Sequence, residues 1–414
     1  MNNKTENSES ERQALALVVQ QHYGKLLALL IKDLRDFQLA EDSLQDAIES
    51  ALVHWQRSGL PNSPTAWLLQ TARRKAIDRL RRLKTFKGKS AELSYLMDIE
   101  QQQTDTSESY AIPDERLRLI FTCCHPALDP HTAAALSLRT LCGLSTPEIA
   151  RAFVVGEEAM AQRLVRARQK ISKAGIVYEV PEPPNLLSRL EAVLNTIYLT
   201  FNAGYGAIQH RIDLCEEAIR LARMVKDLCP DQPEAAGLLA LLLLTHSRRN
   251  ARISSNSVYI PLELQDRIMW DQAMIDEGEA ILVAALKAKQ VGRYQLQASV
   301  SAIHAEAKSH EETHWGEIVQ LYSKLYDHTE NAVYLLNRAV ALSFRDNPSS
   351  ALRAMEEISI ELQNYQPYHA ARADFLRRAG NFEEARLAYE LAISLSKNTI
   401  EQNYLTQMRA SLLS

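Results

Sequence analysis

Residues Leu144–Ile171 read LSTPEIARAFVVGEEAMAQRLVRARQKI, and this stretch decides the fold of the middle of the chain. Ser145 is a favourable N-cap, and Glu148 three residues later completes a capping box for a short helix. Residues 154–156 then turn the chain, and Glu157 begins a second, longer helix. A short helix, a tight turn and a longer basic helix predict a helix-turn-helix, whose second helix enters the major groove of DNA.

The second helix of this motif separates an apolar face from a polar one. Met160, Leu164 and Ile171 recur at helical spacing and are expected to pack inward. Its cations supply phosphate contacts and salt-sensitive affinity, whereas the two glutamates at its start are either base-reading acceptors or helix caps. Taken alone, the motif is also compatible with a helical hairpin that has a solvated basic face. The candidate DNA-contacting residues on this helix are Glu157, Glu158, Gln162, Arg163, Arg166 and Arg168.

A second basic helix is predicted upstream, where Pro64–Arg82 reads PTAWLLQTARRKAIDRLRR. An apolar stripe follows one side from Trp67 to Leu83 at spacings of three and four, and we expect Trp67 to lie in the core. The opposite side attracts a polyanion, most commonly nucleic acid. Its candidate nucleic-acid-binding residues are Arg73, Arg74, Lys75, Arg79, Arg81 and Arg82.

An acidic helix precedes the basic one, within Asp33–Trp55 (DLRDFQLAEDSLQDAIESALVHW). Its apolar side includes Leu44 and Ala47. Opposite charges on two successive helices, joined by the turn-rich loop Gln56–Pro64, suit two different partners, although a solvated acidic face is the alternative. The acidic residues of this helix are Asp36, Glu41, Asp42, Asp46 and Glu49.

Two linkers are predicted from composition. Glu100–Ala111 (EQQQTDTSESYA) is polar and lacks apolar periodicity. Closely spaced prolines mark the second, within Tyr178–Asn195, because proline stops helices and stiffens the chain.

Behind the second linker the chain is predicted to be helical to its end. Asn331–Ile358 and Tyr368–Leu395 each show an apolar helix, a short polar turn and a second helix. Alanines such as Ala385 and Ala392 let paired helices approach closely. The pattern resembles the tetratricopeptide repeat (TPR), and an ordinary antiparallel helix pair is the alternative.

Taken in order, these motifs resemble regions 2 and 4 of extracytoplasmic-function (ECF) sigma factors of the sigma-70 class, and the resemblance covers Gln13–Ala174. The back half resembles the long C-terminal extension of one ECF subgroup, with TFNAGY (Thr200–Tyr205) among its cues. The resemblance implies an all-α fold, with two small helical sigma domains, the second a helix-turn-helix, and a larger TPR-like repeat domain. The implied limits are 13–85 for region 2, 86–112 for a flexible linker, 113–175 for region 4, 176–185 for a proline-rich linker and 186–414 for the C-terminal domain.

The resemblance also implies partners for each motif. The helix Leu39–Ile48 is expected to dock on the beta-prime clamp of core RNA polymerase through Glu41, Asp42, Gln45 and Asp46. Of these, Asp42, Gln45 and Asp46 are expected to be exposed. Region 4 is expected to dock on the beta flap. The loop Gln56–Pro64 and the basic helix behind it are expected to engage the −10 element of promoter DNA. The helix-turn-helix is expected to read the −35 element. Apart from the resemblance, the C-terminal domain is expected to regulate the front half by protein contact, because it is acidic while both DNA-facing helices are basic. A protein partner of this domain is also expected. The turn FVVGEEA departs from the family pattern, since two acidic residues open its recognition helix.

Two other function classes compete with a sigma factor. One is a polymerase-independent helix-turn-helix regulator with a ligand- or protein-sensing repeat domain, and the acidic helix Leu39–Ile48 argues against it. The other is an enzyme carried by the C-terminal half, although no nucleophile or phosphate loop is recognisable. Cys123 and Cys124 lack a second Cys-x-x-Cys pair and are expected to be buried small apolar residues, not zinc ligands. No cofactor and no catalysis are expected.

Bulk composition is consistent with a cytoplasmic, nucleoid-associated protein without a membrane segment. The longest apolar run, Ala235–Thr245, is about half of the ~20 residues that a spanning helix needs. The N-terminus lacks an apolar signal-peptide core. Residues 1–184 contain 24 Lys and Arg and 23 Asp and Glu, so the front half is nearly neutral. Residues 185–414 contain 23 Lys and Arg and 28 Asp and Glu, so the back half is acidic.

Overall fold

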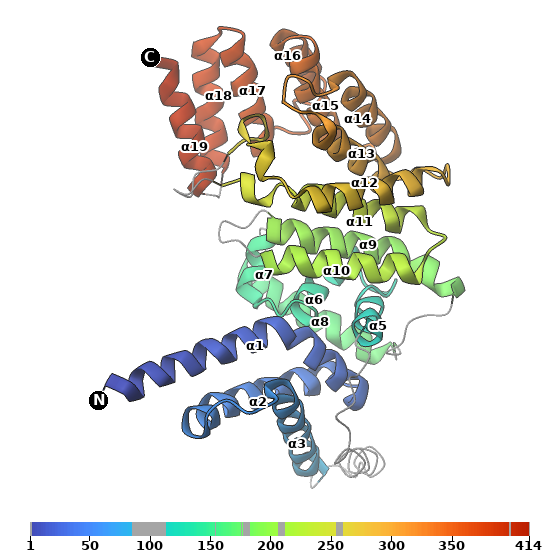
Figure 1. The fold of residues 1–414 in the computed structure, drawn as a ribbon, viewed down its shortest axis with the longest axis vertical. Coiled ribbons are helices and arrows are strands. Elements are labelled where there is room, and N and C mark those ends of the chain that lie inside the picture. Colours follow the sequence, from blue (N-terminus) through green and yellow to red (C-terminus); the bar gives the residue numbers. More distant parts are fainter. Residues whose placement is uncertain are drawn as a thin grey trace. The chain divides into compact units, whose positions relative to one another are not determined.

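The computed structural model describes residues 2–84, 113–153, 155–174, 176, 183–205, 212–253, 260–396 and 399–413. These residues are almost entirely helical, as the composition predicts (Figure 1). The chain divides into two compact units, Met1–Gly204 and Tyr205–Ser414. The division falls after the first helix of the predicted C-terminal domain, and the predicted domain limits themselves stay predictions.

Three helices form the front of unit 1: α1 (Asn2–Leu34), α2 (Phe37–Ser58) and α3 (Pro64–Lys84). The Asp36 side chain caps α2 by accepting a hydrogen bond from the Leu39 N–H at 3.0 Å. Gly59 ends α2 with a φ of 75°, a conformation that suits glycine, and its N–H donates to the Trp55 carbonyl. Pro64 is the first residue of α3. Proline is favourable there, because a backbone N–H at this position would have no acceptor within the helix.

Five further helices complete unit 1: α5 (Pro113–Cys123), α6 (Pro130–Thr140), α7 (Thr146–Ala152), α8 (Glu157–Lys173) and α9 (Pro183–Tyr205). The first predicted linker, 86–112, lies outside the described residues. The second, within Tyr178–Asn195, is too long as predicted, because residues 183–195 are helical. Pro183 and Pro184 stand in the first turn of α9, where proline is tolerated.

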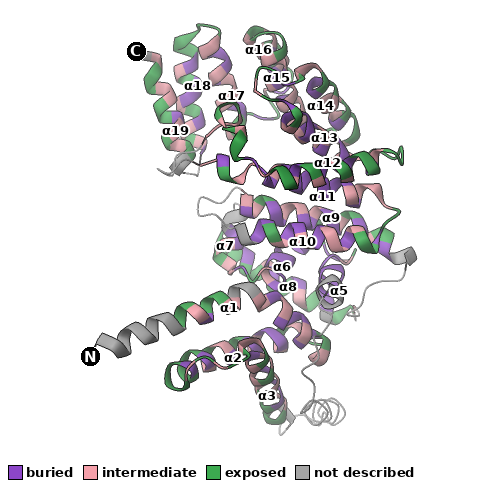
Figure 2. Cartoon of the chain, in the orientation of Figure 1, coloured by how far each residue is buried: buried purple, intermediate pink, exposed green. Residues whose placement is uncertain are grey.

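Unit 2 begins with α10 (Ile212–Leu228), α11 (Pro233–His246), α12 (Gln272–Leu286) and α13 (Arg293–Glu306). The apolar run Ala235–Thr245 is the body of α11, which is buried almost all round between its neighbours (Figure 2). Three 3-10 turns lie between α11 and α12: η1 (Arg249–Ala251), η2 (Leu262–Leu264) and η3 (Arg267–Met269). The apolar run is therefore a core helix of unit 2.

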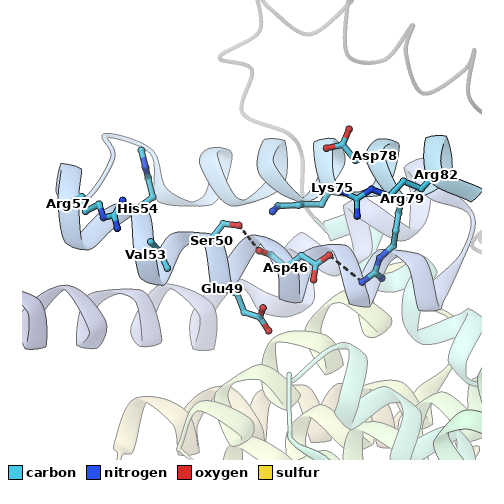
Figure 3. A pocket seen from close by; sticks show the side chains of 10 residues that line it. All are labelled: Asp46, Glu49, Ser50, Val53, His54, Arg57, Lys75, Asp78, Arg79 and Arg82. Carbon is cyan, nitrogen blue, oxygen red and sulfur yellow. Dashed lines mark hydrogen bonds and ion pairs between the residues drawn. The ribbon is translucent and has the colours of Figure 1, made fainter.

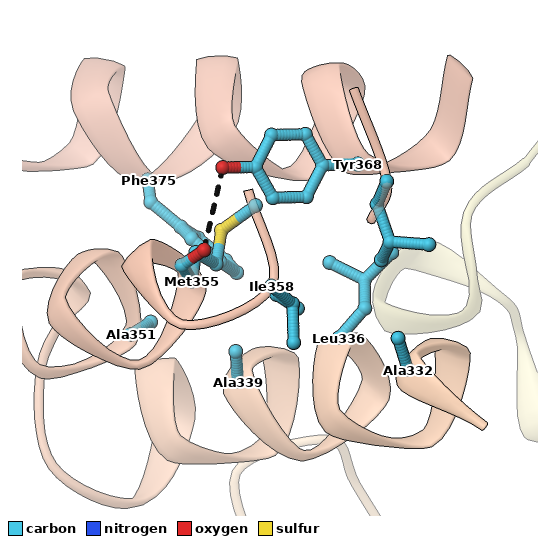
Figure 4. Packing of buried hydrophobic residues seen from close by; sticks show 9 residues of the cluster. Ala332, Leu336, Ala339, Ala351, Met355, Ile358, Tyr368 and Phe375 are labelled. Carbon is cyan, nitrogen blue, oxygen red and sulfur yellow. Dashed lines mark hydrogen bonds between the residues drawn. The ribbon is translucent and has the colours of Figure 1, made fainter. Parts of the chain in front are cut away.

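The rest of unit 2 consists of α14 (Trp315–Thr329), α15 (Ala332–Arg345), α16 (Pro348–Glu356), α17 (Gln366–Arg378), α18 (Phe382–Leu395), α19 (Thr399–Ala410) and the short turn η4 (Ser411–Leu413). Figure 4 shows one of its cores, in which Leu336 of α15, Met355 of α16 and Phe375 of α17 meet. The Tyr368 hydroxyl donates to the Met355 carbonyl at 3.4 Å. The two predicted helix pairs are thus confirmed as α15–α16 and α17–α18, and their likeness to tetratricopeptide repeats stays a prediction.

Among the described residues, no single helix is long and apolar enough to cross a bilayer. Arg12–Val19 and His22–Leu34, which are bent against each other, meet the length and composition criterion only when they are taken as a pair.

Candidate functional site

The helix-turn-helix forms where the sequence predicts it. The Ser145 backbone N–H donates to the Glu148 carboxylate at 2.8 Å, and the Ser145 hydroxyl lies 2.6 Å from the same oxygen. The Glu148 N–H returns a longer bond of 3.4 Å to that hydroxyl. This reciprocal capping box starts α7, and α8 follows after the turn.

Helix α8 divides into a buried and an exposed face. Met160, Leu164, Ala167 and Ile171 are all at most 3% exposed, so the predicted apolar face is the packed one. Of the six candidate DNA-contacting residues, Glu157, Glu158, Gln162 and Arg166 are exposed and Arg163 is half-buried. Arg166 also donates to the Gln162 side chain at 3.3 Å. The exposed face therefore presents both acceptors and a cation.

Arg168, the sixth candidate, lies against α2. Its guanidinium is 2.6 Å from one carboxylate oxygen of Glu41, and it donates to the Gln38 amide oxygen at 3.2 Å. The other oxygen of Glu41 pairs with Arg139 of α6, also at 2.6 Å. Glu41 is 6% exposed. Glu41 therefore lies in an internal ion-pair cluster with Arg139 and Arg168, here called the Glu41 cluster. Its role in polymerase binding stays a prediction.

Close backbone packing surrounds the Glu41 cluster. Gly24 of α1 lies so near the α6–α7 turn that a Cβ atom there would be 2.0 Å from the Leu141 carbonyl oxygen. Gly143, with a φ of 65°, lies beneath the Tyr23 ring. Burial, together with the nearby Glu41 carboxylate, raises the pKa of Tyr23 to about 12. The α1–α2 face and the α6–α8 face are therefore matched in both shape and charge.

A groove of about 620 Å³ runs between α2 and α3 (Figure 3). Arg79 of α3 reaches across it to Asp42 at 2.5 Å and to Asp46 at 3.3 Å. All three side chains are a third or more exposed. Two predicted partner-binding acids and one predicted DNA-binding cation thus pair with one another. The groove is lined by Asp46, Glu49, Ser50, Val53, His54, Arg57, Lys75, Asp78, Arg79 and Arg82.

Comparisons with known proteins identify both halves of this site. The model "Sigma-70 region 2" matches residues 18–86, and "Sigma-70, region 4" matches residues 118–171. The chain belongs to the ECF group of the sigma-70 family. It is thus a sigma factor, a transcription factor that binds core RNA polymerase and promoter DNA and directs promoter-specific transcription.

The comparisons extend beyond the two sigma regions. Residues 189–286 of the sigma factor match a "Family of unknown function (DUF6596)". A protein of Rhizobium meliloti (strain 1021), described as uncharacterized, is 41% identical over 385 residues, which cover 92% of this chain and 91% of that protein. No solved structure matches the chain.

The remaining cations of region 2 differ in their surroundings. Arg73 pairs with Asp33 of α1 at 2.6 Å, and both side chains are largely buried, so Arg73 holds α3 to α1. Arg74, Arg81 and Arg82 are exposed, while Lys75 is half-buried. Of the six candidate DNA-binding cations of α3 in the sigma factor, three are therefore exposed and three are partly buried.

Aromatic side chains gather near the loop that joins α2 to α3. Trp67 is half-buried, in contrast to its predicted place in the core, and it stacks on His54 with centroids 5.6 Å apart. Trp55, which is buried, meets the Trp67 ring edge-on, with centroids 5.5 Å apart. Sequence reasoning missed His54, although its spacing of four from Ser50 and Ser58 places it on the exposed side of α2.

Region 4 of the sigma factor is joined to α9 by buried polar contacts. The thiol of Cys124 lies 3.2 Å from the Thr196 hydroxyl, and Arg189 donates to the Phe121 carbonyl at 3.4 Å. Burial raises the pKa of Cys123 to about 12 and that of Cys124 to about 11, so both thiols stay protonated. The prediction that these cysteines are buried is confirmed. In the described part of the chain, no group of three or more His, Cys, Asp or Glu could hold a metal ion.

Proposed function

We propose that α8 reads the −35 element of the promoter through Glu157, Glu158, Gln162 and Arg166. The observation that carries the proposal is the division of α8, whose apolar face is packed while these four side chains are exposed. A guanidinium pairs with guanine, and a carboxylate accepts from the amine of cytosine. The mixture of acids and cations favours base reading over phosphate binding alone, because carboxylates repel phosphate.

Region 2 would bind two partners from neighbouring helices. Asp42, Gln45 and Asp46 of α2 dock on the beta-prime clamp of the polymerase, and Gln45 is the most open of the three. The exposed cations of α3 engage the −10 element. Arg79 lies between the two surfaces because it pairs with Asp42 and Asp46. Polymerase binding to these acids would thus release Arg79 toward DNA.

The Glu41 cluster holds a resting arrangement in which regions 2 and 4 are closed on each other. Two guanidinium nitrogens of Arg168 are bound to Glu41 and Gln38, so a phosphate must displace Glu41 to pair with the same nitrogen. Binding two separate promoter elements requires the two regions to separate. Promoter DNA, which is a dense polyanion, competes with Glu41 for Arg168 and favours the open arrangement. Region 4 would then be free to dock on the beta flap.

The C-terminal domain would regulate the front half by protein contact. Its first helix, α9, is fixed to region 4 through Thr196 and Arg189. The back half is acidic, whereas the DNA-facing helices are basic. Comparing the full chain with one ending at Tyr205, which keeps α9, tests this role in transcription across a salt series. Identical promoter output from both chains at every salt concentration contradicts a regulatory role.

Promoter reading is tested by transcription with core polymerase from promoters randomised at −35. Replacing Arg166 by Ala should relax the base preference at one position and lower the affinity by about 1–3 kcal/mol. Lys173→Ala is the matched control, because Lys173 is exposed at the far end of the same helix. An unchanged base preference for the Arg166 variant would remove α8 as the −35 reader.

A further inference from the structure

A cluster of cationic and aromatic side chains in unit 2 has no part in promoter reading. Arg248 precedes η1, Arg267 begins η3 and Trp270 follows η3. The guanidinium carbons of Arg248 and Arg267 lie 5.8 and 4.9 Å from the centroid of the Trp270 ring. His304, near the end of α13, accepts a hydrogen bond from Arg267 through its backbone carbonyl. His310 lies within the same group, since its ring and that of His304 both contact Trp315.

The two arginines of this cluster lack the carboxylate partners that neighbouring arginines have. Arg249, next along the chain, pairs with Asp271 at 2.9 Å. Arg378, which also stacks on an aromatic ring, bonds Ser343 at 3.0 Å and lies 3.6 Å from Asp374. Within the described residues, neither Arg248 nor Arg267 makes an ion pair. Burial and the positive charge of Arg248 lower the pKa of Arg267, so two like charges are held close together.

Several nitrogen atoms of the cluster are buried without a hydrogen-bond partner among the described residues. Trp270 and His304 are only 7% and 8% exposed. A buried polar group left unpaired destabilises the fold, and more so when it is charged. The nitrogens without an acceptor are Arg248 Nε, Arg267 Nη2, Trp270 Nε1, His304 Nδ1 and both ring nitrogens of His310.

We propose that Arg248, Arg267, Trp270, His304 and His310 form a binding site for the oxyanion of a small ligand, a carboxylate or a phosphate. An oxyanion neutralises both guanidinium groups and accepts from the indole and imidazole N–H groups. Arg248, Arg267 and His310 are half-buried and give access from the surface, while Trp270 and His304 are buried behind them. Burial lowers the pKa of His304 to about 3, so its ring is a neutral hydrogen-bonding group at pH 7.

The test is calorimetric titration of the full chain at pH 7 with inorganic phosphate and, separately, with malonate, at constant ionic strength set by chloride. Arg248→Met removes charge and donors but keeps an apolar stem against Trp270. We expect it to weaken anion binding about tenfold or more, as for loss of a charge-assisted hydrogen bond. Arg345→Met is the matched control, because Arg345 is an exposed arginine of the same unit that pairs with Asp346. Its binding should equal that of the wild type.

Trp270→Phe is a second variant, which keeps a ring for the arginines to stack on and removes the indole N–H. It should weaken binding about threefold to tenfold, as for loss of a neutral hydrogen bond. Binding of phosphate alone identifies a phosphate-bearing ligand, and binding of malonate alone a carboxylate. The proposal is overturned if neither anion binds the wild type, or if Arg248→Met and Arg345→Met bind equally well. The titration contains neither DNA nor polymerase, so its failure leaves the promoter-reading role untouched.

Discussion

The carboxylate of Glu41 lies 2.6 Å from the guanidinium of Arg168, so one ion pair joins the acidic helix of region 2 to the recognition helix of region 4. Arg139 pairs with the other carboxylate oxygen, and all three side chains are mostly buried. Removing one member of such a group leaves charge buried without compensation, which makes the cluster a strong determinant of how the two regions meet.

Glu41→Gln should open this contact. The neutral amide cannot compensate two guanidinium groups, and we expect a loss of about 3 kcal/mol from the closed arrangement. Hydrogen exchange should become faster in the 141–144 turn and in α8, while α3 keeps its protection. Glu49→Gln is the control, because it makes the same change at an exposed site of α2. Equal exchange in both variants would show that Glu41 does not hold the regions together.

Gly24→Ala should separate the same two faces by steric means. In an isolated helix alanine is favoured over glycine by about 1 kcal/mol, so α1 itself gains stability. The added Cβ meets the Leu141 carbonyl oxygen at 2.0 Å, and neither atom belongs to a flexible side chain. We expect a larger hydrodynamic radius with unchanged helix content by circular dichroism. A radius equal to that of the wild type argues against a closed resting arrangement.

Charge reversal of Asp42 and Asp46 should abolish co-purification with core RNA polymerase. Because both acids also hold Arg79, the reversal has a second effect inside region 2. Arg79→Met separates the two effects, since it breaks the same ion pairs and leaves both acids exposed. Polymerase binding that survives Arg79→Met but not the double reversal assigns the acids to docking. Binding that survives both changes places the docking surface elsewhere.

Unit 2 should lose stability as the pH falls below 6.5. Burial lowers the pKa of His246 to about 4 and that of His304 to about 3. Both histidines are neutral in the folded chain at a pH where the unfolded chain already binds protons. Each therefore contributes stability that is full above pH 6.5 and falls by about 1.4 kcal/mol per pH unit toward its folded pKa. Urea unfolding of wild type and His304→Gln at pH 7 and pH 5 measures this, and the variant should show the shallower dependence. Equal slopes contradict the assignment to His304.

Local signals made the helix-turn-helix predictable. Ser145 and Glu148 are three residues apart, and the apolar residues of α8 recur within one helix, so neighbours in sequence decide both features. The Glu41–Arg168 pair joins residues 127 positions apart and depends on how α2 docks on α8, which no short-range pattern records. The same holds for the ion pair between Asp33 and Arg73, a candidate DNA-binding residue.

The prolines of the second predicted linker show that a local pattern can also be misinterpreted. Pro183 and Pro184 suggested a linker, yet both stand at the start of α9, because the first turn of a helix needs no N–H bond. The cluster around Trp270 was equally hidden, since Arg248, Arg267 and His304 come from separate elements that only the fold brings together.

Promoter-specific initiation is tested most directly by reconstitution. Purified chain, core RNA polymerase and a library of promoters randomised at −35 and −10 should yield transcripts enriched for one sequence at each element. Arg166→Ala should relax that enrichment at −35 only, while core polymerase alone yields none. Transcripts with no sequence enrichment, or enrichment that is the same with and without the chain, would contradict promoter reading by this protein.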